Sequence, residues 1–198
     1  MVCSMVRTRE FDTEDAVARA MDLFWSHGYE ATSLQDLTSA LGIGRGSLYA
    51  AFGSKQGLYQ VALERYRQQC VRPMIEVLSR HDPDVRSTIR ALFAVQIEDA
   101  VADERRRGCM VVNAVAERVP HDRTTTETVR DVLDGNERAL TEALATAQRH
   151  GELSPEKDPG ALGAFLATLM TGLRIAAKTH PDRDALMRTV DVALTALD

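Results

Sequence analysis

Helical periodicity is the feature that most restricts the fold of this chain. Apolar residues recur at steps of three and four positions from Val17 to Leu197, the spacing that places side chains on one face of an α-helix. No segment shows the alternation of apolar and polar residues expected of a half-buried strand. The sequence therefore predicts an all-α fold.

The first expected helix begins near Thr13, which we interpret as its N-cap, and stops at Gly28. Its core face comprises Val17, Ala20, Met21, Phe24 and Trp25.

Two short helices are expected next. Ser33 is followed three residues later by Asp36, which marks a helix start, and Gly42 can adopt the positive φ of a helix C-cap. A third helix, from about Gly44 to Phe52, would turn Leu48 and Phe52 inward. Two short helices joined by a glycine turn and braced by a longer preceding helix predict a helix-turn-helix.

The rest of the chain predicts a larger helical domain. Ser54 is the expected N-cap of a fourth helix, which Pro73 must kink or end. We expect a boundary that divides the chain into residues 1–57 and 58–198. Further helical patterns cover residues 89–100, 109–117, 129–149, 162–177 and 186–197, with turn signals at Asp82-Pro83, Gly108, Pro120 and Gly151 and a helix opening at Asp158-Pro159-Gly160.

Composition narrows the class of protein. The chain has 198 residues, 44% of them apolar, and a net charge of −5, which argues against a surface that binds nucleic acid everywhere. No run approaches about 18 apolar residues and residues 1–10 lack a signal-peptide core, so we expect a cytoplasmic protein with no membrane partner. The three cysteines and the histidines lack metal-ligand spacing, which favours reduced thiols, no metal and no cofactor.

The glycine-rich stretch from Ala40 to Tyr59 raises the alternative of an enzyme that binds a nucleotide. A dinucleotide fingerprint starting at Gly42 or Gly44 would need a third glycine where Ser47 or Tyr49 stands. A P-loop would need adjacent glycine and lysine, and no strand pattern precedes the stretch. With no visible arrangement of catalytic acid, base or nucleophile either, we expect a protein that is not an enzyme.

The residues from Phe24 to Leu58 resemble the DNA-binding domain of the tetracycline-repressor (TetR) family. The resemblance rests on Phe24, Gly28-Tyr29, Thr32-Ser33, Leu37, Leu41-Gly42-Ile43, Gly46-Ser47-Leu48-Tyr49, Phe52 and Ser54-Lys55. It implies a transcriptional regulator, in most cases a repressor, that binds double-stranded DNA at an inverted-repeat operator as a homodimer and responds to a small-molecule effector. The chain departs from the pattern at Gly44, where the family often has serine, and at Ala50-Ala51, where bulkier polar residues are common.

The predicted interface with DNA follows from helix geometry. Arg45, at the start of the third helix, is the leading candidate to read guanine, with contact to phosphate or solvent alone as the alternative. Gly46 permits close approach, while Ser47 and Tyr49 can donate hydrogen bonds, although Tyr49 could instead be an apolar brace. Helix starts favour phosphate, and there we expect Thr32, Ser33 and Lys55 to hold the DNA backbone.

The larger domain is expected to hold the effector. The candidate contacts are Phe93, Cys109, Met110, Asn113, Phe165, Met170 and Arg174, and for most of them a plain core position is the alternative. The stretch from Arg107 to Asn113 is similar to a Gly-Cys-hydrophobic segment in a subset of these regulators. Three arginines and a helix start next to Cys109 suggest a thiolate that senses electrophiles or oxidants, against the alternative of a small buried hydrophobe.

A dimer interface is predicted on the last two helices, because they hold more apolar residues than one core face needs. The interface residues expected there are Leu162, Phe165, Leu166, Leu169, Leu173, Met187, Val190 and Leu194. The alternative to a regulator is an all-α interaction or scaffold protein without specific DNA binding.

Overall fold

The structure is a computed structural model that describes residues 12–79 and 84–198. Cys3, His81 and the expected turn at Asp82-Pro83 lie outside the described residues. The described residues are largely helical and contain no β-strand, which confirms the predicted fold class. The chain divides into two compact units, Met1–Arg65 and Tyr66–Asp198. This division falls at the end of the fourth helix, whereas the boundary expected from sequence falls near its start.

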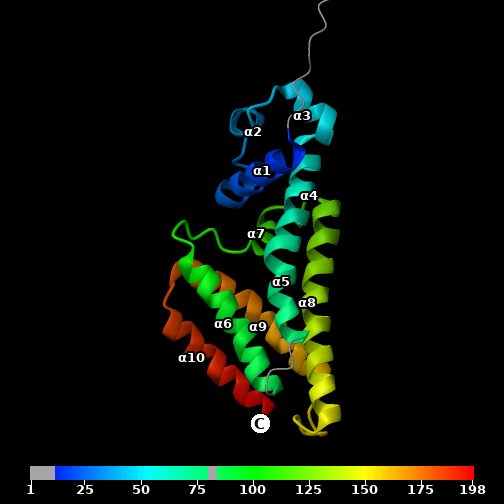
Figure 1. The fold of residues 1–198 in the computed structure, drawn as a ribbon, viewed down its shortest axis with the longest axis vertical. Helices are drawn as coiled ribbons and strands as arrows, with labels where there is room; N and C mark the ends of the chain where they lie inside the picture. The colour runs from blue at the N-terminus through cyan, green and yellow to red at the C-terminus, as the bar shows by residue number, and fades with distance from the viewer. Residues whose placement is uncertain (1–11, 80–83) are drawn as a thin grey trace, which may run out of the picture. The chain divides into compact units, whose positions relative to one another are not determined.

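The first unit is built from α1 (Thr13–His27), α2 (Leu34–Leu41), α3 (Arg45–Phe52) and most of α4 (Lys55–Tyr66) (Figure 1). Buried side chains from all four helices form its core, among them Phe24, Leu37, Leu48 and Leu58. α2 and α3 are the expected helix-turn-helix.

Capping explains where these helices start and stop. Ser33 and Asp36 form a reciprocal capping box at α2, and Gly42 ends that helix in the left-handed region with φ of 69°. The Ser54 hydroxyl accepts a 2.9 Å hydrogen bond from the Gly57 amide at the start of α4. The N-cap expected at Thr13 is wrong by one residue, because the Asp12 carboxylate accepts hydrogen bonds from the first amides of α1.

Pro73 was expected to kink or end the fourth helix, and the regular helix α4 already ends at Tyr66, seven residues before it. After Tyr66 the helical path widens into a π-helix, η1 (Arg67–Val71), and then continues as α5 (Arg72–Ile75) with the proline in its first turn. Proline cannot donate a backbone hydrogen bond, and the wider turn just before it is how the chain continues without that bond.

The second unit contains the remaining helices. They are η2 (Glu76–Ser79), α6 (Val85–Ala102), α7 (Met110–Glu117), α8 (Arg123–His150), α9 (Pro159–Thr179), α10 (Arg183–Leu194) and the short η3 (Thr195–Leu197). Within this unit α6 packs against α9 and α10, and α8 packs along α9 (Figure 1). Gly163 allows α9 to approach α8 closely, since a Cβ atom at this position would lie 2.1 Å from Thr141 Oγ1 on α8.

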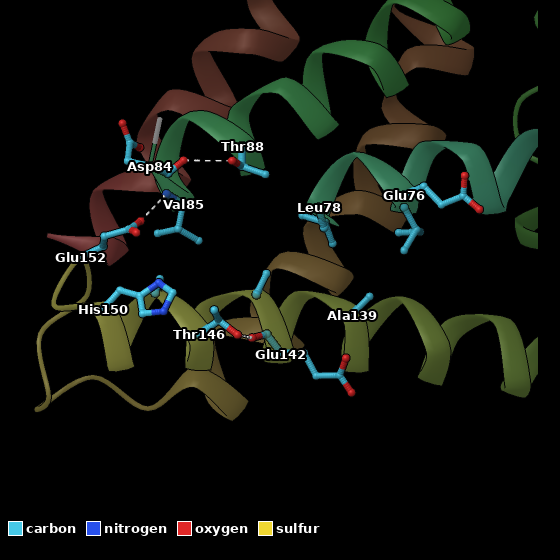
Figure 2. Close-up of a pocket in the computed structure, with 13 residues that line it drawn as sticks. Glu76, Leu78, Asp84, Val85, Thr88, Ala139, Glu142, Thr146, His150 and Glu152 are labelled. Carbon is cyan, nitrogen blue, oxygen red and sulfur yellow. Dashed lines mark hydrogen bonds between the residues drawn. The ribbon is translucent and has the colours of Figure 1, made fainter. Parts of the chain in front are cut away.

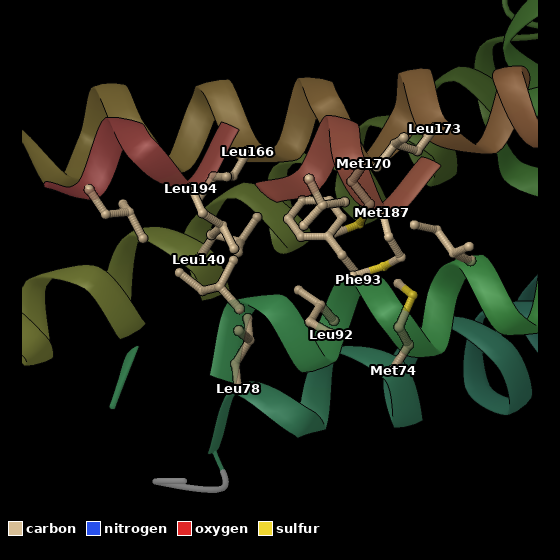
Figure 3. Close-up of a cluster of buried hydrophobic side chains, with 14 of the residues drawn as sticks. Met74, Leu78, Leu92, Phe93, Leu140, Leu166, Met170, Leu173, Met187 and Leu194 are labelled. Atoms are coloured by element: carbon tan, nitrogen blue, oxygen red, sulfur yellow. The ribbon is translucent and has the colours of Figure 1, made fainter. Parts of the chain in front are cut away.

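One apolar cluster joins α5, α6, α8, α9 and α10 (Figure 3). It corrects the predicted dimer interface, because the members that face this core are not available to a second chain. They are Leu166, Leu173, Met187, Val190 and Leu194, each at most 5% exposed. α10 buries a single apolar stripe, and the chain's own core covers that stripe completely.

Candidate nucleic-acid interface and effector cavity

α3 presents an exposed polar face at its start. Arg45 is its first residue and Tyr49, four positions on, lies on the same face with 45% of its surface exposed. Within the described residues the Arg45 side chain has no hydrogen-bond or ion-pair partner. Gly46, Ala50 and Ala51 are exposed beside it and Ser47 is half-buried. This face offers one guanidinium and one phenol to a ligand, while Leu48 is buried beneath.

The start of α3 has no side-chain cap. Its N-cap residue is Gly44, which cannot form a side-chain hydrogen bond because glycine has no side chain. The first-turn amides of a helix have no partner within the helix, and they attract anions. Glycine at this position therefore leaves these amides open to an outside acceptor such as phosphate.

Thr32 is the one predicted DNA contact that the structure contradicts. Its side chain is 1% exposed and its hydroxyl donates a 2.6 Å hydrogen bond to the Gly28 carbonyl. The neighbouring Ser33 is exposed, and its hydroxyl exchanges hydrogen bonds with Asp36. Thr32 therefore fixes the turn before α2, and Ser33 alone of the pair lies at the surface.

Lys55 is oriented by an aromatic ring that the sequence analysis left without a role. Its Nζ atom lies 4.1 Å from the centre of the Tyr29 ring, a cation–π contact. Tyr29 in turn packs on Phe24 and Tyr59, with ring centres 6.0 and 5.0 Å away. The lysine is thus positioned at the start of α4 by the core of the first unit.

Arg65, a further basic residue on α4, forms an ion pair within the first unit. Its Nη1 atom lies 2.6 Å from the Glu14 carboxylate, which ties α4 to α1. The side chain is 23% exposed, so it contributes little free positive charge to the surface. Arg45 and Lys55 are then the basic side chains that the predicted interface retains.

A small cavity in the second unit brings together part of the predicted effector site. Cys109, Met170 and Arg174 line it, and its volume is about 20 Å³, room for a water-sized molecule. Met74, Asn136 and Thr171 also line it and were not predicted from the sequence. Its apolar wall consists of Val71, Val111, Val112, Val132 and Leu133.

The other predicted contacts lie elsewhere. Phe93 and Met110 are buried at 2% or less and do not line the cavity, and Phe165 is 45% exposed on α9. The Asn113 amide donates a 2.9 Å hydrogen bond to the Arg107 carbonyl and so fixes the loop before α7. These side chains therefore do not line the small cavity, because helical spacing alone does not say which face turns inward, and their contact with an effector stays a prediction.

Cys109 lies at the N-cap of α7 and is 9% exposed. The three arginines before it were expected to favour a thiolate. Arg107 instead forms an ion pair with Asp103 at 3.1 Å, and the side chains of Arg105 and Arg106 are exposed. Its thiol instead contacts the hydroxyl of Tyr66, whose pKa is raised well above its ordinary value, first by burial and then by the neighbouring thiol.

Cys70 lies in the same neighbourhood. Burial raises the pKa of this thiol, and Arg174 opposes that shift. The positive charge of Arg174 lowers the pKa of both Cys70 and Tyr66, a role that the sequence had suggested for the arginines before Cys109.

A larger groove of about 470 Å³ lies between the end of the α5 segment, the start of α6 and α8 (Figure 2). Two of its carboxylates are occupied by the chain itself: Asp84 caps α6 through the Ser87 amide, and Glu152 accepts a 2.8 Å hydrogen bond from the Val85 amide. None of the predicted effector residues lines this groove.

Comparison with known proteins assigns the family. Residues 16–62 match the profile described as bacterial regulatory proteins, tetR family, and residues 86–193 match the tetracyclin repressor-like C-terminal domain. The chain belongs to the TetR family. The resemblance seen in the sequence is confirmed, and the second match extends it to the larger domain.

Relatives of known name are transcriptional regulators. The chain is 35% identical over 195 residues to YezE of Bacillus subtilis, described as an uncharacterized HTH-type transcriptional regulator, covering 98% of this chain and 100% of YezE. It is 31% identical over 188 residues to the repressor ComR of Escherichia coli, covering 95% and 90%. Among solved structures, a cysteine mutant of the TetR-family regulator CifR complexed with 26-base-pair operator DNA is 36% identical, with a TM-score of 0.87, covering 97% of this chain and 100% of that one.

Proposed function

We propose that this protein is a ligand-responsive transcriptional repressor of the cytoplasm that binds an inverted-repeat operator as a homodimer. The observation that carries the proposal is the exposed start of α3, where Arg45 has no partner in the described part of the chain and the helix start is uncapped. The operator complex of the relative CifR supports the same use of this fold.

Arg45 is assigned to base readout and Lys55 to phosphate. A guanidinium at the start of a recognition helix can donate two hydrogen bonds to guanine in the major groove. Tyr49 and Ser47 lie on or beside the same face, and Ser33 and Lys55 stand at the starts of α2 and α4, where helix amides favour phosphate. With Gly46 allowing close approach, these residues form the proposed DNA interface.

The homodimer is assigned to α9. Between residues 161 and 175 its exposed positions recur at steps of three and four and are uncharged: Ala161, Phe165, Thr168, Gly172 and Ile175. The exposed Lys178 brings the first charge, in the last turn of the helix. By contrast, the exposed positions of α10 include Arg183, Asp184, Arg188 and Asp191. α9 is long and apolar enough to cross a membrane by length and composition, with mean hydropathy 1.5 over a window of which 28% is buried.

Core packing and a dimer contact together explain the apolar composition of α9 in this fold. One face of α9 belongs to the apolar core, and an uncharged exposed face on the same helix matches the surface that a second copy would cover. Leu162 and Leu169, half-buried on α9, would flank it. A two-fold axis through α9 would give two recognition helices, and half-sites in successive major grooves are about 34 to 36 Å apart.

The effector is assigned to the cavity beside Arg174 and Cys109. A ligand that binds one conformation of the dimer more tightly than another by about 1 to 3 kcal/mol would change operator affinity about 5- to 150-fold. An electrophile or oxidant that modifies Cys109 would act at the same wall by adding bulk where the free volume is about 20 Å³.

The experiment is a fluorescence-anisotropy titration with duplex DNA taken from beside the gene, compared with random duplex of equal length. We expect tight binding to one fragment, and Arg45→Ala to reduce it by about 1 to 3 kcal/mol per half-site while random DNA is affected less. Equal, weak binding to every fragment would favour a scaffold protein instead.

A further inference from the structure

Among the described residues, two good hydrogen-bond donors in the small cavity have methionine sulfur, a weak acceptor, as their partner. Arg174 Nη2 donates to the Met74 sulfur at 3.3 Å, and Asn136 Nδ2 lies 3.9 Å from the Met170 sulfur. All four side chains line the cavity. Thioether sulfur is a poor acceptor compared with oxygen, so both donors would gain from a ligand that brings an oxygen.

Arg174 also lacks a counter-ion. In the described ranges 12–79 and 84–198 no carboxylate lies within ion-pair distance of it, although other half-buried arginines, such as Arg107 and Arg118, each have one. A charge held among apolar side chains is costly unless it is paired. The cavity therefore combines a single uncompensated positive charge with a neighbouring amide.

Both sulfur acceptors belong to methionine side chains of the apolar core. Methionine is unbranched, has three rotatable bonds and adapts to irregular space. Met74 lies in the short helix α5, directly after Pro73 and the π-helical segment, and Met170 lies on α9. Rotation of both side chains away from the donors would free the polar end of the cavity and enlarge it beyond its present 20 Å³ or so.

We propose that this cavity binds a monocarboxylate effector with an apolar tail. The carboxylate replaces the two methionine sulfurs and accepts hydrogen bonds from Arg174 and Asn136, since a planar guanidinium matches a carboxylate in shape and charge. The tail lies against Val111, Val132 and the other aliphatic side chains of the wall. This inference rests on the proposed function and names the chemical class of its effector.

One guanidinium sets the preferred charge of the ligand. It balances a single negative charge, and the described residues that line the cavity include no second cation that a phosphate dianion would need. Cys109 and Thr171 line the same cavity and add polar side chains to its wall. A neutral ester or alcohol of the same length would bury its tail equally well but leave Arg174 on its sulfur partner.

The test is calorimetric titration of the full-length protein with straight-chain monocarboxylates from butyrate to decanoate, each matched by its methyl ester and primary alcohol. We expect at least one carboxylate to bind, about tenfold or more tighter than its ester. Arg174→Gln should lose that preference, while Arg188→Gln, on the exposed face of α10, should keep it. Binding of ester and acid with equal affinity, or of no carboxylate at all, would overturn the proposal.

A second variant keeps the test decisive if Arg174→Gln fails to fold. Met74→Leu conserves volume but removes the sulfur that competes for Arg174, so the carboxylate should bind at least as tightly as to the wild type. A loss of carboxylate binding in a folded Met74→Leu protein would count against the exchange of partners. Operator binding is measured separately without ligand: its absence would refute the proposed function, whereas intact operator binding without carboxylate binding refutes this inference alone.

Discussion

Replacing Phe165 by glutamate should dissociate the proposed dimer. The ring is 45% exposed in the single chain. A phenylalanine can bury about 200 Å², so about 90 Å² of this ring remains for a partner to cover. At about 25 cal/mol per Å² that surface is worth about 2 kcal/mol, and a two-fold axis counts it twice.

The free energy of dimerisation should therefore fall by about 4 kcal/mol, which weakens the dimer about a thousandfold. Any cost of burying the new carboxylates would add to this loss. Sedimentation velocity over a range of concentrations measures this directly. The matched control is Val192→Glu on α10, where the side chain is 70% exposed on a charged face, and it should leave the dimer unchanged. If Val192→Glu dissociates the dimer and Phe165→Glu does not, the interface lies on α10 and the assignment to α9 is wrong.

Three further predictions concern stability, sensing and phosphate contact. The Asp122 carboxylate caps α8 and pairs with Arg118, and although burial opposes the shift, hydrogen bonds from Thr125 and Arg118 hold its pKa below the ordinary value. Asp122→Ala should lower the free energy of unfolding, measured with urea at neutral pH, by about 1 to 2 kcal/mol. This difference should persist as the pH falls to the ordinary carboxyl pKa, and it should shrink as the pH falls further through the lower pKa of the folded state. An unchanged urea midpoint would contradict the role of Asp122 as a cap. Treatment with a mild quinone or peroxide should release wild-type protein from its operator and leave Cys109→Ser bound, and equal behaviour of the two would make Cys109 a structural residue. Lys55→Ala should weaken binding to operator and random DNA alike and reduce the slope of log affinity against log salt by about 0.9 per lysine; a sequence-dependent loss would assign Lys55 to base readout instead.

Local chemistry was predictable from the sequence wherever one short segment determines it. The capping box of Ser33 and Asp36, the left-handed Gly42 and the helix opening at Asp158-Pro159 depend on residues a few positions apart. Neighbouring polar residues were harder to separate. Thr32 and Ser33 both read as surface donors at a helix start, and only the packing of the turn shows that Thr32 faces inward.

The candidate surfaces depended on which face of each helix the core uses. Apolar residues occur on both α9 and α10, so composition placed the dimer on both helices. α10 has one apolar stripe, through Met187, Val190 and Leu194, and the core consumes it. α9 has apolar residues on its far side as well, at Phe165 and Ile175, and these remain exposed.

The cavity partners were beyond the reach of sequence reasoning. Met74 and Arg174 are a hundred positions apart, and Asn136 meets Met170 only because α8 packs along α9. Arg174, an isolated charge within an apolar helix, pointed to this site from the sequence. Asn136, a polar residue at a position of the apolar stripe of α8, is a second such signal.

Footprinting on the DNA beside the gene shows whether a dimer of this chain reads an inverted repeat through α3. We expect two protected half-sites related by two-fold symmetry, with centres about 34 to 36 Å apart along the duplex, and loss of both with Arg45→Ala at the same protein concentration. Protection of a single half-site, or protection that covers random DNA equally well, would contradict it.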